Sequence, residues 1–254
     1  MWKILRVSLL AVLLLVVAGR FVLDRYYSRA WNSTLWVAVF PVNADGSAVT
    51  RSYVDALQAE QFASIETFFA REAHRYGVNL PKPVHVQLMP VVTELPPQLP
   101  KGAGVATIAL WSLKMRWYAW RYGSNSISRV RVFVLYHDPE RTPAVPHSLG
   151  LQKGLVGVVY GFADRSMTGT NAIVVVHEVL HTLGATDHYD LATGQPLYPQ
   201  GYAQPDLQPR HPQPVAEIMA GRRALTSATA EMPESLAEVA VGAVTASEIN
   251  WRFR

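Results

Sequence analysis

The sequence predicts a globular α+β domain, and three observations support that fold class. Several short segments rich in β-branched and aromatic residues have the pattern of strands. Other, longer segments have the apolar periodicity or the length of helices. The chain of 254 residues is 50% hydrophobic and 17% charged, which is enough to bury one sizeable core. We therefore expect one main domain.

Four segments predict strands, because their residues are β-branched or aromatic, or because polar and apolar side chains alternate along them. These segments are residues 34–43, 83–92, 128–138 and 154–164. The first strand ends in the turn Ala44-Asp45-Gly46, and the Pro-rich residues 94–102 predict a connector.

Helices are expected in three places outside the basic aromatic segment described next. Residues 50–76 carry apolar side chains near a 3.6-residue period and predict one continuous amphipathic helix. Residues 171–185 predict a buried helix that ends at Gly184. A helix near the C-terminus is expected to begin at a cap formed by Thr245 or Ser247.

Residues 103–123 interleave tryptophan and tyrosine with lysine and arginine, which predicts a basic aromatic helix. In one interpretation the aromatic side chains pack on the sheet and the cations coat the solvent face. In the other the helix contacts a membrane surface. Further along, residues 190–214 contain six prolines, so they form either a flexible linker or an irregular segment held against the domain.

Residues 1–30 form a region separate from the domain at 31–254. The apolar run at 4–23 is about long enough to span a bilayer, and the small residues at 17–19 also fit a signal-peptidase site. Arginines on both sides of the run leave its orientation undecided. We expect a membrane-anchored protein whose domain lies outside the cytoplasm, in a bacterial periplasm or at the cell surface, or a secreted one if the segment is cleaved.

Composition and missing motifs argue against several classes of function. The chain has no cysteine, so any transition metal has to be held by His, Asp and Glu. Its net charge of +4 is spread without a long basic run, and we expect no nucleic-acid partner. The chain also lacks GxSxG, GxxxxGK and GxGxxG motifs, which argues against serine-hydrolase, P-loop and dinucleotide-binding chemistry.

The stretch HEVLHTLGATDHYD, residues 177–190, has the spacing of a zinc site. Residues four apart share one face of a helix, so His177 and His181 would present two imidazoles to one metal ion. Glu178 would project beside them, where a carboxylate can take a proton from water without binding the ion. The alternative is an ordinary helix with two hydrogen-bonded histidines, but a buried His-Glu-His cluster is costly without a partner.

A hydrolytic zinc site needs a third protein ligand and an open fourth position. Gly184 can adopt a positive φ, so the chain can leave the helix sharply and return a ligand from just beyond the turn. Two adjacent residues stand there, Asp187 and His188, and the spacing alone leaves the choice between them open.

The motif HEVLHTLGATD resembles the HExxHxxGxxH/D motif of the metzincin zinc peptidases, and its Asp187-His188-Tyr189 order resembles the snapalysin-like members. The resemblance implies that Asp187 is the third ligand, and His188 would then either support the site or cap the turn. Residues 216–221 resemble the Met-turn, whose methionine, here Met219, would lie beneath the metal.

The resemblance also implies a fold. That fold is a twisted, mostly parallel sheet with a backing helix and an active-site helix over residues 31–185. An irregular C-terminal subdomain with the Met-turn and a C-terminal helix would follow over 186–254. The strand at 154–164 would border the cleft and pair with an extended substrate.

The activity implied is that of a zinc endopeptidase with one Zn²⁺, a peptide or protein substrate, and Glu178 as general base and acid. Two alternatives remain: a non-catalytic envelope protein with a structural zinc site closed by His188 or His211, and a zinc hydrolase acting on a non-protein amide.

The sequence departs from the family pattern after the Met-turn. Where some metzincins have a tyrosine that stabilises the reaction intermediate, this chain has Gly221. Three tyrosines near the motif are candidates for that role: Tyr189, Tyr198 and Tyr202.

Overall fold

The structure is a computed structural model that describes residues 6–7, 12, 19, 23, 26–100, 102–123, 126–145, 148–151 and 155–251. The expected anchor or signal at 4–23 lies almost entirely outside these residues. Among the helices of the described residues, none combines the length and the apolar character needed to cross a bilayer.

One five-stranded sheet forms the centre of the domain, in the order β2-β1-β3-β5-β4. Its strands are β1 (Leu35–Asn43), β2 (Val84–Leu88), β3 (Val130–His137), β4 (Leu149–Leu151) and β5 (Val156–Phe162). The first three and β5 run parallel, whereas β4 pairs antiparallel with β5 and lies at the edge. The four predicted strands are confirmed, and β4 was not predicted.

Strands β1, β3 and β5 are buried on both faces, as a parallel sheet requires. Val37 and Val39 of β1 face one core, and the alternate residues Ala38 and Phe40 face the other. This explains why β1 is almost continuously apolar in sequence.

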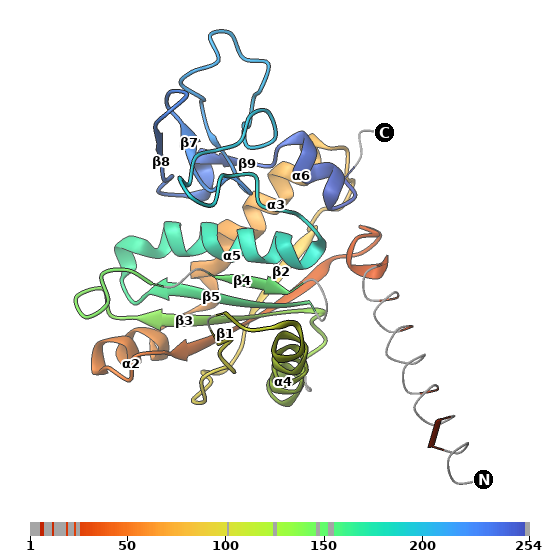
Figure 1. The fold of residues 1–254 in the computed structure, drawn as a ribbon, viewed down its shortest axis with the longest axis vertical. Helices are drawn as coiled ribbons and strands as arrows, with labels where there is room; N and C mark the ends of the chain where they lie inside the picture. Colours follow the sequence, from red (N-terminus) through yellow and green to blue (C-terminus); the bar gives the residue numbers. More distant parts are fainter. Residues whose placement is uncertain are drawn as a thin grey trace.

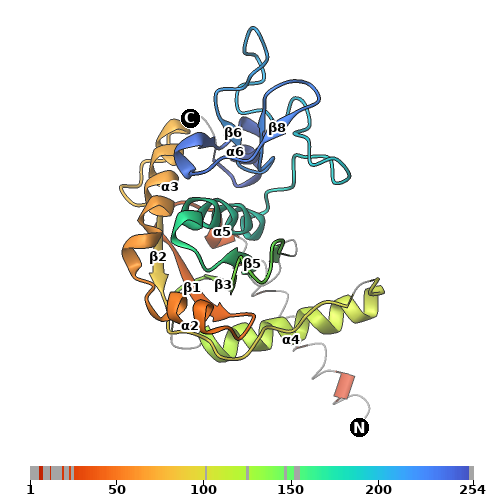
Figure 2. The same ribbon diagram turned by 90° about the vertical axis from the view of Figure 1, so that its left-hand side faces the viewer.

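Helices cover both faces of the sheet, which makes a three-layer arrangement (Figure 1). Helices α3 (Ala63–Arg75) and α5 (Thr168–Leu183) lie on one face. Helix α4 (Val105–Gly123) lies on the other and extends beyond the sheet (Figure 2). The α+β class and the mostly parallel sheet are therefore as predicted.

The helix expected at 50–76 is interrupted, so that prediction was wrong in its continuity. Helix α2 (Ala48–Asp55) is followed by the 3-10 turn η1 (Ala59–Phe62) before α3 begins. Gln58 is extended, with φ −129° and ψ 158°, and its backbone N–H donates to the Gln61 side chain at 2.8 Å. This capping interaction begins a new helical segment, so the apolar period at 50–76 is divided between two helices.

The C-terminal part packs on α5 and shares its core, since Ile218, Met219 and Trp251 belong to the same buried cluster as Leu180. Its short elements are β6 (Ala216–Glu217), β7 (Arg223–Ala224), β8 (Ala230–Glu231), η3 (Leu236–Glu238), β9 (Val239–Ala240) and α6 (Ala243–Glu248). Residues 184–215, all described, contain no helix and only two isolated bridges, one within the segment and one to β6. The Pro-rich segment is therefore an irregular segment of the domain.

The cap predicted for the C-terminal helix was wrong. Helix α6 begins after Gly242, which is its N-cap, and both predicted caps, Thr245 and Ser247, lie inside the helix. The Thr245 hydroxyl donates instead to Glu217 Oε1 at 2.7 Å. The hydroxyl therefore binds Glu217, which is distant in the sequence, and does not cap the helix.

Candidate metal centre

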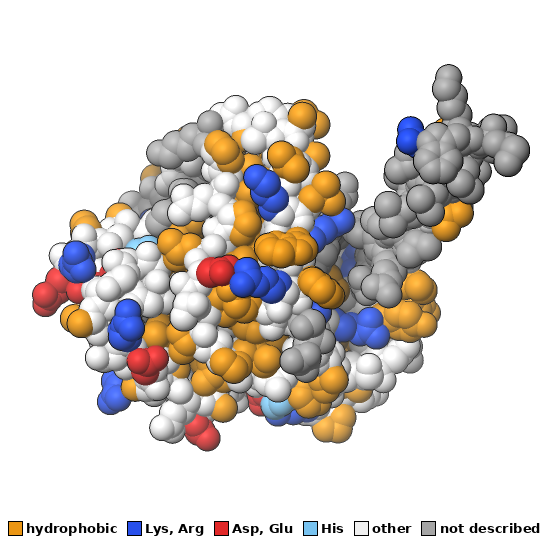
Figure 3. All heavy atoms as spheres, turned by 90° about the horizontal axis from the view of Figure 1, so that it is seen from below, with side chains coloured by type: hydrophobic (Ala, Val, Ile, Leu, Met, Phe, Trp, Pro, Cys, Tyr) orange, Lys and Arg blue, Asp and Glu red, His pale blue; other side chains and the backbone are white. Residues whose placement is uncertain are grey.

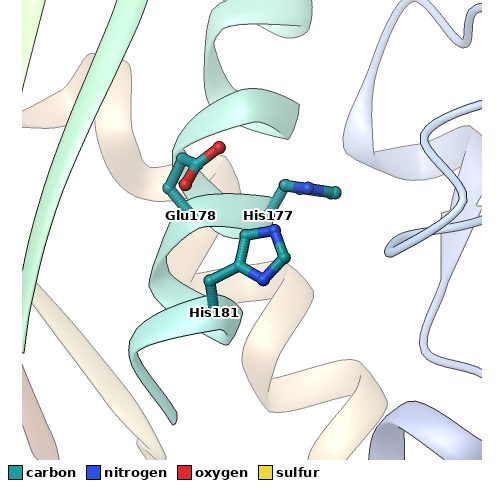
Figure 4. Close-up of side chains that lie close together, drawn as sticks. All are labelled: His177, Glu178 and His181. Atoms are coloured by element: carbon teal, nitrogen blue, oxygen red, sulfur yellow. The ribbon is translucent and has the colours of Figure 1, made fainter. Parts of the chain in front are cut away.

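Helix α5 carries the first three residues of the site. It is buried along most of its length, and Asn171 near its start binds both the N–H and the C=O of Phe162 on β5. It ends at Gly184, which has the predicted positive φ, 102°. His177, Glu178 and His181 leave neighbouring turns, with the two imidazoles edge to face and ring centroids 4.6 Å apart (Figure 4).

Backbone carbonyls orient both imidazoles. Nδ1 of His177 lies 3.0 Å from the carbonyl oxygen of Ile218, and Nδ1 of His181 lies 2.9 Å from that of Ala185. A carbonyl can only accept, so each Nδ1–H donates and each neutral ring keeps its Nε2 lone pair free. Hydrogen bonds of this kind are how metal-binding histidines are usually fixed.

Asp187 completes a cluster of three atoms. Its Oδ1 lies 3.1 Å from Nε2 of His177 and 3.1 Å from Nε2 of His181. Ligand atoms placed tetrahedrally about 2.0–2.1 Å from a zinc ion are about 3.3–3.4 Å apart. Both distances to Asp187 are therefore close to the spacing between two ligands of such an ion.

The electrostatics of this cluster favour a bound cation. When both imidazoles are neutral and their Nδ1 atoms donate to carbonyls, the three atoms are all acceptors, so either a metal ion or a proton on an imidazole has to lie between them. Burial disfavours charge on His181, but Asp187 and Glu178 outweigh it and raise the pKa of this imidazole. Burial likewise opposes ionisation of Asp187, but the imidazoles of His177 and His181 prevail and lower its pKa.

Glu178 also has a buried carboxylate oxygen without a hydrogen-bond partner among the described residues. Its side chain is 3% exposed, and the oxygen without a partner is Oε2. Its carboxylate and the two imidazoles offer ligand atoms within 4.8 Å of one another. Burial raises the pKa of Glu178, although both histidines oppose the shift. A buried carboxylate without a partner beside three acceptors fits a metal ion and a water molecule.

His188, the alternative third ligand, does not point to this cluster. Its Nδ1 lies 3.6 Å from Glu217 Oε2, and its Nε2 lies 3.5 Å from Glu248 Oε2. Burial opposes charge on His188, but the two glutamates outweigh it and raise its pKa. The other proposed closing residue, His211, has Nε2 3.0 Å from the Tyr202 hydroxyl.

The chain turns tightly at residues 217–221 beside the two histidines, with backbone hydrogen bonds from Ala220 and Gly221 to the carbonyl of Glu217. Met219 is fully buried there, and its carbonyl accepts from the N–H of His188 at 3.0 Å. With the Ile218 carbonyl on His177, this turn touches both the helix and the loop of the site.

Glu217 is a residue that sequence reasoning missed. It is fully buried and accepts four hydrogen bonds, which organise the turn and join it to α6. The donors are Met219 N at 2.7 Å, Ala220 N at 3.0 Å, Gly242 N at 3.0 Å and Thr245 Oγ1 at 2.7 Å. No local signal in the sequence separates this glutamate from an exposed one.

Strand β5 borders the cleft through Tyr160, as predicted for 154–164, but the edge strand is β4, so the prediction that 154–164 pairs with an extended substrate was wrong. Strand β5 is covered by β4, which packs directly against α5. A Cβ atom on Gly150 of β4 would come within 2.4 Å of the His181 Cβ and 2.7 Å of the Glu178 carbonyl oxygen. Glycine at this position therefore lets the edge strand approach the helix closely.

A cleft of about 320 Å³ opens over the cluster. Of the three tyrosines considered, only Tyr189 lines it, whereas Tyr198 packs on Tyr202. Burial, foremost, and the negative charge of Asp187 raise the pKa of Tyr189, which keeps its hydroxyl protonated. Arg222 contributes a cation to the same cleft.

Comparison with known proteins leaves the family of the chain open. No family model matches it, and no curated protein matches it. Among solved structures, wild-type OgpA from Akkermansia muciniphila is similar with a TM-score of 0.38 and 10% identity, over 84% of this chain and 58% of that one. Catalytically inactive OgpA from the same organism, in complex with an O-glycopeptide substrate, gives a TM-score of 0.34 and 11% identity, over 81% and 58%. The chain thus spans less than two thirds of these neighbours, and similarity at this level defines neither family nor activity.

Proposed function

We propose that this protein is a zinc-dependent peptidase of the metzincin type, closest in motif to the snapalysin-like members. One observation carries the proposal: Oδ1 of Asp187 lies 3.1 Å from Nε2 of His177 and 3.1 Å from Nε2 of His181, and all three residues line the cleft. In this proposal these three residues hold one Zn²⁺, and the turn with Met219 serves as the Met-turn. The motif resemblance and the orientation of both imidazoles support the assignment.

Zinc, when bound, supplies Lewis-acid polarisation of the scissile carbonyl and makes a water molecule more acidic. Glu178 accepts the proton of the attacking water and passes it to the departing amine. Its free Oε2 and its burial suit that role, because burial raises the pKa of this carboxylate and so makes it a stronger base. Tyr189 lines the same cleft, and in this proposal its hydroxyl donates to the developing oxyanion.

The substrate in this proposal is an extended peptide. Among the described residues no strand pairs with the outer side of β4, the edge strand next to the metal helix. A peptide laid along this edge would be held by backbone hydrogen bonds and delivered to Glu178. For the protein as a whole, we propose that residues 4–23 carry the domain out of the cytoplasm, as an anchor or a cleaved signal.

The structural-zinc alternative is less favoured. A structural site closes its fourth position with a protein ligand, and both candidates for that position, His188 and His211, are engaged elsewhere. An unpartnered glutamate at the site is also unnecessary for a purely structural ion.

The test combines metal content with cleavage of a peptide library by the full chain and its Glu178→Gln variant. We expect about one zinc per chain in both proteins, and cleavage slower by about 10²–10⁴-fold or more in the variant. Glu60→Gln, which changes an exposed glutamate far from the cluster in sequence, is the matched control and should keep both properties.

Full activity in Glu178→Gln would contradict the assigned proton transfer. A zinc-loaded chain that cleaves amides of other kinds and no peptide would move the proposal to a non-protein substrate.

A further inference from the structure

Helix α4 has two apolar faces, and only one of them is covered. Trp111, Met115 and Tyr118 are buried against the sheet. The opposite face carries large apolar side chains at i, i+3, i+7 and i+10, which form one straight stripe. They are Leu110, Leu113, Trp117 and Trp120, exposed by 55%, 61%, 58% and 63%. We call these four residues the α4 stripe.

Cations border the α4 stripe on both sides. At 100° per residue, Lys114 and Arg121 fall on one flank of the stripe and Arg116 falls on the other. The helix contains no acidic residue. Glu94, from the Pro-rich connector, is the acid beside it and pairs with Arg121 at 2.9 Å. Figure 3 shows this face, where apolar side chains gather with basic ones between them.

Residues close to the N-terminal end of the domain lie on the same side of the sheet. Arg131 points to the α4 side, since a Cβ on Gly123, the last residue of α4, would meet the Arg131 side chain at 2.2 Å. Arg129 is two residues earlier and stacks over the exposed Tyr27 at 5.1 Å. Tyr27 follows the apolar run at 4–23 by a few residues in the sequence. Its partner Arg129 precedes Arg131, which contacts the end of α4.

We propose that the α4 stripe lies on the surface of an anionic lipid bilayer. Tryptophan and leucine would enter the boundary between headgroups and acyl chains, and the flanking cations would bind lipid phosphates. The stripe is about 15 Å long at about 1.5 Å per residue, so it lies along the interface and does not cross it. In the sequence, a second apolar segment at 4–23 ends a few residues before Tyr27.

Charge argues against a second copy of this chain as the partner. Pairing two α4 stripes would bring Lys114, Arg116 and Arg121 of one copy close to the same three residues of the other. Like charges at that distance destabilise a complex, whereas lipid phosphates offset them.

The experiment uses the absence of cysteine, because a single introduced thiol is the only labelling site in the chain. Full-length Leu113→Cys, carrying a nitroxide, is reconstituted in phosphatidylcholine vesicles with and without about one third phosphatidylglycerol. Collision rates with oxygen and with an aqueous nickel chelate report depth. Ala228→Cys, exposed beside β8 at the opposite end of the domain, is the matched control (Figure 1).

With the anionic lipid, we expect the ratio of oxygen to nickel collisions to rise several-fold at position 113 and to stay constant at 228. Adding Lys114→Glu to the Leu113→Cys chain should return the ratio toward the aqueous value. Equal nickel access at positions 113 and 228 would overturn the proposal. Dipolar broadening between labels at 113 would also overturn it, because it would mean that a second copy covers the stripe.

Discussion

The candidate metal centre is built from two regions that are held in place in different ways. Helix α5 supplies His177, Glu178 and His181 through a repeating backbone, so their relative positions follow from helix geometry alone. Asp187 comes from an irregular loop, and the carbonyl that orients His177 comes from the turn at 217–221.

Buried polar contacts replace backbone periodicity in the second region. Glu217 binds the turn, and Glu248 of α6 accepts from the N–H and hydroxyl of Thr186 at 3.0 and 2.6 Å, one residue before Asp187. His188 lies between the two glutamates. The helical half of the site can therefore tolerate loss of one contact better than the loop half, where each contact fixes several backbone groups.

Exchanging Asp187 or His188 for alanine should give the largest contrast between a residue in the cluster and one that supports it. Asp187→Ala removes one of the three converging atoms, and we expect zinc affinity to fall by more than about 100-fold. His188→Ala should cost about 10–100-fold or less, as is typical of residues that only support ligands. Competition with a chromogenic chelator at fixed pH measures both constants. Zinc that depends on His188 and ignores Asp187 would reverse the assignment.

Glu217→Gln tests whether buried polar contacts hold the loop region. Glutamine has one acceptor oxygen where the carboxylate has two, and its NH₂ group would face backbone donors. We expect a loss of about 2–3 kcal/mol in the free energy of unfolding, measured by urea denaturation of the metal-free protein. The exposed Glu234 gives the matched control Glu234→Gln, with an effect near zero. A stable Glu217→Gln protein with unchanged zinc affinity would show that the turn holds without its glutamate.

The same contrast explains what the sequence could predict. The strands at β1, β3 and β5, the helix α5 and its end at Gly184 follow from local patterns, because periodicity and glycine conformation are properties of a few consecutive residues. The spacing of the motif brought His177 and His181 together for the same reason.

Long-range contacts account for what the sequence could not predict. Strand β4 has three residues and depends on Gly150 fitting against α5, which no local pattern shows. Glu217 is buried only because the turn and α6 meet. The break after α2 reflects a side-chain cap at Gln58 within an otherwise helical period. In helix α4 the aromatic residues indicated a packed face but did not show that a second apolar face stays exposed.

Gly184→Ala tests the junction between the two regions. Gly184 has φ 102°, which is unfavourable for a residue with a Cβ, so we expect a cost of about 1–2 kcal/mol in unfolding free energy. The shift of the next residue, Ala185, would also disturb the carbonyl that orients His181 and lower zinc affinity modestly. Gly104→Ala is the control, since its Cβ would meet open space. Equal stability of both variants would mean that the helix end adjusts without cost.

Asp45→Asn should have the smallest effect and extends the comparison to a loop outside the site. The Asp45 carboxylate accepts hydrogen bonds from Ser47 N, Thr50 Oγ1 and Asp138 N, and so joins the turn after β1 to the end of β3. Burial opposes ionisation, but the hydrogen bonds, foremost that from Asp138, outweigh it and lower the pKa of Asp45 to about 2. Because this carboxyl is partly exposed, its contribution should stay below about 1 kcal/mol.

The pH dependence of that small effect has a definite sign. A pKa that is lower in the folded chain than the ordinary value of 3.8 stabilises the fold above about pH 4, and this contribution disappears as the pH falls toward 2. The difference in unfolding free energy between the parent and Asp45→Asn should therefore be largest near neutral pH and shrink below pH 4. Denaturant unfolding of both metal-free proteins across that range measures it. If the difference in unfolding free energy grew in acid, the Asp45 carboxylate would destabilise the turn. This loop outside the site would then not be held by the kind of contact that Glu217 makes within it.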